Sequence, residues 1–172
     1  MKPIAVSACC AAALLLAACA ATPVQVPANL VPAGERSVDR IASRGIAIYE
    51  CRASSAPSGA AWVYAAAEAE LLDAAGRTIG RHTFPPPAWQ LEDGSRIAGE
   101  IKARADAPVA GAVPWLLVAT RSTGGDGRLA KTTSLQRVNT AGGAAPAAGC
   151  DSTSIGAKQR IPFAADYVLF AK

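Results

Sequence analysis

The sequence predicts a single all-β domain, either a β-sandwich or a partly closed antiparallel barrel of about eight strands with long loops. Short apolar stretches recur between clusters of Gly, Pro, Asp and Ser, and no long helical period follows the N-terminal segment. In Arg96–Ala105, "RIAGEIKARA", apolar or small residues alternate with mostly charged ones, the period of a strand with one face in water. All Trp and Tyr residues lie in strand-like stretches, as aromatic core residues of a β domain should.

The expected strands follow one another with turn signals between them. Residues 37–44 are ambiguous between a helical turn and a strand, and we favour a strand. Residues 73–76 and 92–95 each contain a Gly that can take a positive φ, so each predicts a hairpin. The three consecutive prolines at 85–87 exclude a central strand at that point. The other strands are expected at 46–51, 61–66, 68–72, 77–84, 89–91, 115–121, 132–139 and 162–170.

Residues 1–18 have the pattern of a lipoprotein signal peptide. Lys2 precedes an apolar run over residues 4–16 that is too short for a membrane helix. The run leads into "LAAC", which ends at Cys19 and resembles the bacterial lipobox; the resemblance implies that Cys19 is lipidated and becomes the first residue of the mature chain. The same site, read as "ACA", also fits ordinary secretory cleavage, so a secreted protein without lipid stays open.

The residue after the cysteine bears on location. Ala20 stands where Asp would retain such a lipoprotein at the inner membrane, which favours an outer-membrane lipoprotein that faces the periplasm or the cell surface. Two or three acyl chains anchor firmly, because each buried methylene contributes about 0.8 kcal/mol. Residues 19–34 carry three prolines and no charge, which predicts a semi-rigid tether before the β domain at 35–172.

The charge of the chain is mild, at 17 Lys and Arg against 13 Asp and Glu. No basic run could follow a phosphate backbone, so nucleic acid is not expected as a partner. The expected partners are the membrane, through the lipid anchor, and a small-molecule or glycan ligand. We expect no cofactor and no metal, because the chain has one histidine and zinc usually takes three or four His, Cys or carboxylate ligands.

Cys51 and Cys150 are the pair that remains once the signal peptide is removed and Cys19 is lipidated. In an oxidising compartment such a pair predicts a disulfide, which in the chain-entropy model contributes about 4.7 kcal/mol for a loop of about 100 residues. The competing interpretation, a redox or metal site, lacks CxxC spacing.

His82 would have to be the base of any Ser-His-Asp hydrolase, because it is the only histidine. Asp93 would orient it and Ser95 would be the nucleophile. No Gly-x-Ser-x-Gly elbow supports this arrangement. The simpler interpretation is a hairpin histidine that packs beside proline and Trp89.

Three residues are candidates for ligand binding. Trp89 follows the proline loop and precedes a charged turn, so we expect it to be exposed and able to stack on a ligand. Arg137 and Asn139 would share one face of their strand, where they could line a pocket; a buried polar network explains them equally well. We therefore expect a non-catalytic envelope module that binds a small molecule, a glycan or an envelope partner, with a secreted hydrolase that uses His82 and Asp93 as the alternative.

Five stretches of the chain resemble an uncharacterised secreted family, the domain of unknown function 3455. They are "SRGIAIYECR" (43–52), "AWVYAAAEAELLDAAGRTIGRH" (61–82), "PAWQLEDGSRIAGEI" (87–101), "VPWLLVATRS" (113–122) and "TSLQRVNTAGGAAPAAGCD" (133–151). The resemblance supports the pairing of Cys51 with Cys150 and implies no activity. The chain departs from the family at Ala47, where relatives usually have Gln, and at residues 85–87, where they commonly have Gly-Pro. A ligand contact made by that Gln would be absent here.

Overall fold

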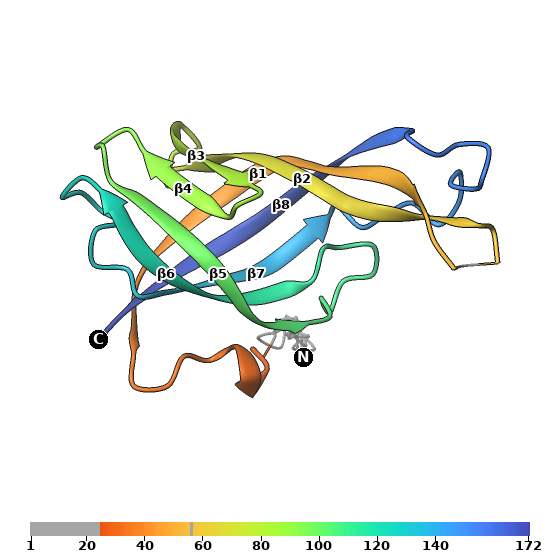
Figure 1. Cartoon of the computed structure of the whole chain (residues 1–172). Coiled ribbons are helices and arrows are strands. Elements are labelled where there is room, and N and C mark those ends of the chain that lie inside the picture. Colours follow the sequence, from red (N-terminus) through yellow and green to blue (C-terminus); the bar gives the residue numbers. More distant parts are fainter. Residues whose placement is uncertain (1–24, 56) are drawn as a thin grey trace, which may run out of the picture.

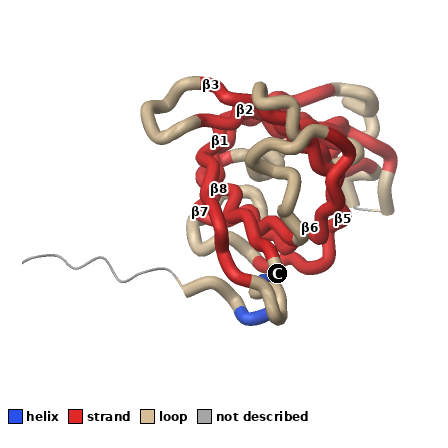
Figure 2. The backbone as a smooth tube through the Cα atoms, turned by 90° about the vertical axis from the view of Figure 1, so that its left-hand side faces the viewer, coloured by secondary structure: helices blue, strands red, loops and turns tan. Residues whose placement is uncertain are grey.

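The computed structural model describes residues 25–55 and 57–172, and within them the chain forms eight β-strands and one short 3₁₀-helix. The elements are η1 (Ala28–Leu30), β1 (Arg36–Ala53), β2 (Ala60–Leu72), β3 (Thr78–Phe84), β4 (Ala88–Leu91), β5 (Arg96–Ala105), β6 (Trp115–Gly124), β7 (Ser134–Gly142) and β8 (Lys158–Ala171). Each strand pairs antiparallel with the next, and β8 returns to pair with β1, so the sheet closes into a barrel (Figure 1, Figure 2). The predicted all-β class is confirmed, and the barrel is the architecture adopted.

The predicted strands correspond closely to the observed ones. β5 has the predicted bounds, and the ambiguous residues 37–44 lie in β1. The stretches predicted at 61–66 and 68–72 form one strand, β2. The three prolines lie in the turn between β3 and β4, where a strand had been excluded.

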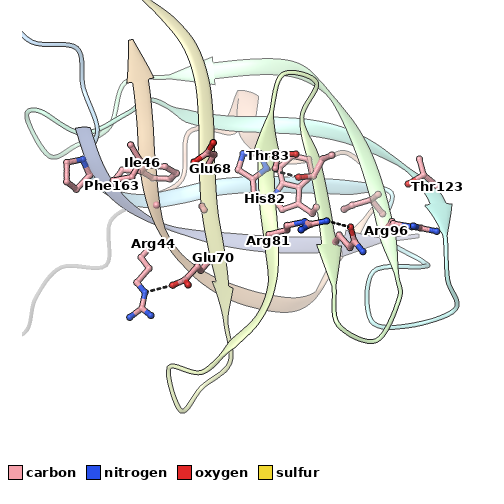
Figure 3. Close-up of a pocket in the computed structure, with 17 residues that line it drawn as sticks. Arg44, Ile46, Glu68, Glu70, Arg81, His82, Thr83, Arg96, Thr123 and Phe163 are labelled. Carbon is pink, nitrogen blue, oxygen red and sulfur yellow. Dashed lines mark hydrogen bonds and ion pairs between the residues drawn. The ribbon is translucent and has the colours of Figure 1, made fainter. Parts of the chain in front are cut away.

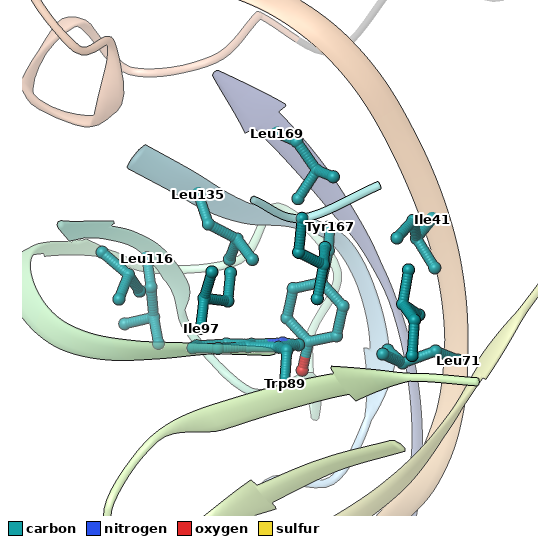
Figure 4. Packing of buried hydrophobic residues seen from close by; sticks show 11 residues of the cluster. Ile41, Leu71, Trp89, Ile97, Leu116, Leu135, Tyr167 and Leu169 are labelled. Carbon is teal, nitrogen blue, oxygen red and sulfur yellow. The ribbon is translucent and has the colours of Figure 1, made fainter. Parts of the chain in front are cut away.

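The core fills the inside of the barrel, because alternate residues of each strand point inward. The largest buried cluster combines aliphatic residues with Trp89 and Tyr167, which lie edge to face with ring centroids 5.6 Å apart (Figure 4). Each Leu, Ile or Val buried here stabilises the fold by about 1.5–3 kcal/mol. A second cluster, rich in alanine, includes Tyr49 and Phe163.

Gly45 in β1 and Gly80 in β3 lie where neighbouring strands approach too closely for a side chain. A Cβ on Gly45 would collide with the main-chain oxygen of Glu68 and with Ala69. A Cβ on Gly80 would collide with the main-chain oxygen of Gln90. Glycine inside a strand commonly marks such a corner of a barrel.

We predict that Gly45→Ala destabilises the protein by about 3 kcal/mol, because the new methyl group would force two paired strands apart. Gly76→Ala is the control: its position has a positive φ of 78° but open space around it, so its cost should stay near 1 kcal/mol. Urea unfolding of both variants measures the difference. Equal losses would contradict the close approach.

The disulfide predicted between Cys51 and Cys150 is present, with the two Cα atoms 5.4 Å apart. It fastens the loop between β7 and β8 to the end of β1. Two further contacts hold the same loop: the Trp62 indole donates to the Ala148 oxygen (2.9 Å), and Gly156 N donates to the Cys51 oxygen (2.8 Å).

The described part of the expected tether packs on the outer wall of the barrel. Leu30 of η1 is fully buried in a cluster with Trp115 of β6 and with β7 and β8. The Asn29 amide donates to the Arg104 oxygen (3.1 Å), and the Gln136 amide donates to the Leu30 oxygen. The signal peptide and Cys19 lie outside the described residues. Within residues 25–55 and 57–172, the chain has no helix of the length and apolarity that a membrane crossing requires.

Candidate functional site

The end of the barrel that holds the β4–β5 turn is closed by a network around Asp93. One carboxylate oxygen of Asp93 accepts hydrogen bonds from the Ser95 amide (2.9 Å) and hydroxyl (2.6 Å), and the other accepts from the Arg128 amide (2.7 Å). These bonds, led by the one from Arg128, lower the pKa of Asp93. The Ser95 hydroxyl in turn accepts from the amide of buried Leu129 (3.2 Å). Arg128 forms an ion pair with Asp39.

His82 is buried and stacks on Trp89, its partner across β3 and β4, with ring centroids 4.5 Å apart. Its Nδ1 lies 2.9 Å from the Ala88 oxygen. Because a carbonyl only accepts, Nδ1 carries the proton and Nε2 keeps its lone pair. Burial lowers the pKa of His82 to about 4, so the ring is neutral at pH 7.

The structure joins Asp93 to Ser95 but does not join either to His82. The hydrogen bonds of His82 and of Asp93 go to different partners. The packing of His82 against Trp89, which the simpler interpretation expects, is confirmed.

His82 makes stability depend on pH. The unfolded chain binds a proton on this ring below about pH 6.5, whereas the folded protein resists it until about pH 4, so stability is lost as the pH falls through this window. The expected loss is about 3 kcal/mol. In His82→Phe, which keeps a ring beside Trp89 but does not titrate there, the loss should disappear. Urea unfolding between pH 7.5 and 4.5 measures it, and parallel curves would contradict the assignment.

Trp89 is not the exposed aromatic that the sequence predicted, since only 4% of it is exposed. The short strand β4 turns its ring into the barrel against Tyr167. Gly99 on β5 makes room for it, because a Cβ there would approach the Trp89 ring to 2.9 Å. A ligand on the outer surface therefore cannot stack on this ring.

Arg137 and Asn139 do not share a face as predicted. The register of β7 shifts after Val138, and Asn139 has a φ of 50°. Asn139 is therefore exposed on the outside, where its amide donates to Asp166 (2.8 Å). Arg137 points into the barrel with 7% exposed, and its Nε and Nη2 donate to the Pro114 oxygen at 3.1 and 2.8 Å.

A cavity of about 50 Å³ lies inside the barrel next to Arg137. It is lined by Tyr64, His82, Phe84, Pro87, Trp89, Ile101, Arg104, Leu116, Val118, Arg137 and Tyr167. Arg137, Trp89 and His82 were candidates from the sequence. Tyr64, Arg104 and Tyr167 were not; the inward alternation of β2 and β8 is the signal that could have placed the two tyrosines here.

Two residues that line this cavity each carry a buried polar group with no hydrogen-bond partner among the described residues: the Trp89 Nε1–H and the Tyr167 hydroxyl. Burial raises the pKa of Tyr167 to about 12, so its hydroxyl is protonated. Trp89 and Ser43 lie near this hydroxyl and oppose that shift, but neither meets the geometry of a hydrogen bond with it. Burying such a group unpaired costs about 1–3 kcal/mol.

A second concavity, open to solvent and about 910 Å³ in volume, is lined by residues of β1 to β6 and of β8 (Figure 3). Arg44 pairs with Glu70 (2.8 Å), and Arg81 donates to Gln90 (3.3 Å). Such exposed ion pairs contribute only about 0–1 kcal/mol. The groove therefore combines these weak polar pairs with apolar lining residues, among them Ile46 and Phe163.

The chain belongs to the family described as a protein of unknown function, DUF3455, which matches residues 32–171. The match covers the barrel and the last residues of the segment packed on its outer wall. No curated protein and no solved structure matches the chain.

Proposed function

We propose that this protein is a non-catalytic binding module of the cell envelope that takes a small molecule into the cavity of its barrel. The observation that carries the proposal is the pair of unpartnered polar groups, Trp89 Nε1–H and the Tyr167 hydroxyl, in a cavity of about 50 Å³. Nearly all buried polar groups in proteins have a partner. A ligand with a hydrogen-bond acceptor would supply one to each.

The size of the cavity limits the ligand. An eight-stranded barrel has room for its own side chains or for one small ligand. Ordinary pockets for drug-sized ligands measure about 300–1,000 Å³. A glycan or an envelope partner would have to use the outer groove instead.

The hydrolase alternative is the weaker proposal. The Ser95 hydroxyl donates to Asp93 and accepts from Leu129 N, so it takes part in the closing network, and no hydrogen bond reaches it from His82. A nucleophile needs its base within hydrogen-bond reach. The geometry therefore favours binding over catalysis.

NMR titration of the ¹⁵N-labelled protein with acetamide, acetate, propionamide and propionate tests the binding proposal. We expect at least one of them to bind and to shift the Trp89 indole signal. Ile101→Phe, which fills the cavity from β5, should weaken that binding at least tenfold. Val38→Phe, on the exposed face of β1, is the control and should bind as the natural chain does. Binding that Ile101→Phe leaves unchanged would refute the site.

The envelope location has its own test, which rests on the "LAAC" pattern before the described residues. We expect the protein from its native membrane to begin at Cys19, to carry acyl chains, and to lack two hydrogens for the disulfide. Intact mass spectrometry after blocking free thiols measures all three. A chain that begins at Ala21 without acyl groups would instead be a free secreted protein.

A further inference from the structure

Arg137 is a buried cation with no acidic partner. Its side chain is 7% exposed, and it takes part in none of the ion pairs found in residues 25–55 and 57–172. Its Nε and Nη2 both donate to one neutral acceptor, the Pro114 oxygen. A buried charge is costly unless it is paired. Arg128 differs from Arg137 in this respect, because it forms an ion pair with Asp39.

The side chains around Arg137 cannot supply the missing negative charge. Among the described residues that line the cavity there is no Asp or Glu, and Arg104 adds a second positive charge. Burial raises the pKa of Tyr64, against the charge of Arg137 and a hydrogen bond with it, and burial also raises the pKa of Tyr167. Both phenols are therefore neutral at pH 7. His82 is neutral as well.

The free donors of Arg137 suit an oxyanion. A guanidinium carries five N–H groups in a flat fork, and two of them are bound to Pro114. Three remain, of which Tyr64 can accept one. The remaining pair matches the two oxygens of a carboxylate, which arginine binds in a bidentate way.

The rest of the lining selects an organic ligand over an inorganic ion. Phe84, Pro87, Ile101, Leu116 and Val118 are apolar. A single water needs about 10–15 Å³ of such space, so about 50 Å³ holds roughly three waters, or a carboxylate with a few carbon atoms. The Trp89 Nε1–H is a further unpartnered donor at the same place.

We infer that the ligand of this cavity is a small organic carboxylate, bound through its oxygens to Arg137, with Arg104, the Trp89 indole and the Tyr167 hydroxyl as further contacts. This inference rests on the proposed function and specifies its ligand class. It assigns a ligand-binding role to Arg137. A purely structural role would not require a positive charge at this position, because a neutral donor could also satisfy the Pro114 oxygen.

The test compares carboxylates with neutral amides of the same shape in the full-length folded protein. The probes are propionate against propionamide and acetate against acetamide, followed through the three ¹⁵N-labelled indole signals. Trp62 and Trp115 are internal controls, because one is bonded to Ala148 and the other lies in the outer cluster. We expect each carboxylate to shift the Trp89 signal alone and to bind at least tenfold more tightly than its amide.

Variants separate charge from fold. Arg137→Gln should abolish the preference for carboxylates, whereas Arg121→Gln, which removes an exposed arginine of β6, should keep it. The comparison of isosteric probes in the natural chain does not depend on the variant folding. Equal or tighter binding of the amides would overturn the carboxylate inference and leave the proposed function standing. If no probe shifts the Trp89 signal, the carboxylate inference and the proposed function are both refuted. Trapped water would then solvate Arg137.

Discussion

The pairing of β1 with β8 is the interaction on which the rest of this structure depends. It joins the first strand to the last along residues 36–50 and 158–171, and it turns an eight-stranded sheet into a ring. Without it the sheet would have two long edges and an open inner face. With it, most of the inward-facing residues are shielded from water. Gly45 permits this geometry, because β1 must pair on both sides while β2 approaches it closely.

Because the barrel is closed, each polar side chain that points inward needs a hydrogen-bond partner inside the protein. Most of them meet this need through main-chain oxygens from other parts of the chain: Ser43 donates to Ala165 (2.9 Å), Tyr49 to Gly143 (2.7 Å) and Thr140 to Val113 (2.7 Å). Such bonds contribute about 0.5–1.5 kcal/mol each, but leaving them unmade would cost more. Four buried polar atoms of residues 25–55 and 57–172 have no partner. Trp89 Nε1 and the Tyr167 hydroxyl belong to residues that line the cavity with Arg137, whereas Trp115 Nε1 and Glu35 Oε2 lie elsewhere.

Much of the fold could be predicted from the sequence because strands are local patterns. The alternation of residues in β5 directly indicates a strand with one solvent-exposed face. The turns at 73–76 and 92–95 are short, and each contains a glycine. The site could be predicted only in part. Arg137 was found, but the direction of Trp89 depends on the space left by Gly99 on the neighbouring strand β5. The direction of Asn139 depends on a bulge in β7. A period of two cannot foresee a bulge, because one extra residue reverses every face that follows it.

Arg137 and Arg128 differ in how their positive charges are compensated. Arg128 lies at the rim, holds Asp39, and helps to close the end of the barrel near Asp93. Its charge is therefore neutralised by a residue of the same chain, and its contacts are structural. Arg137 carries the same group into the interior and meets only neutral partners, the Pro114 oxygen and the Tyr64 hydroxyl. Apolar side chains of similar volume commonly replace buried charges with no loss of stability, so stability alone does not account for a cation at this position. A charge that the fold leaves unpaired, beside unpartnered donors and in a space with room for a few atoms, is best accounted for by a partner from outside the chain.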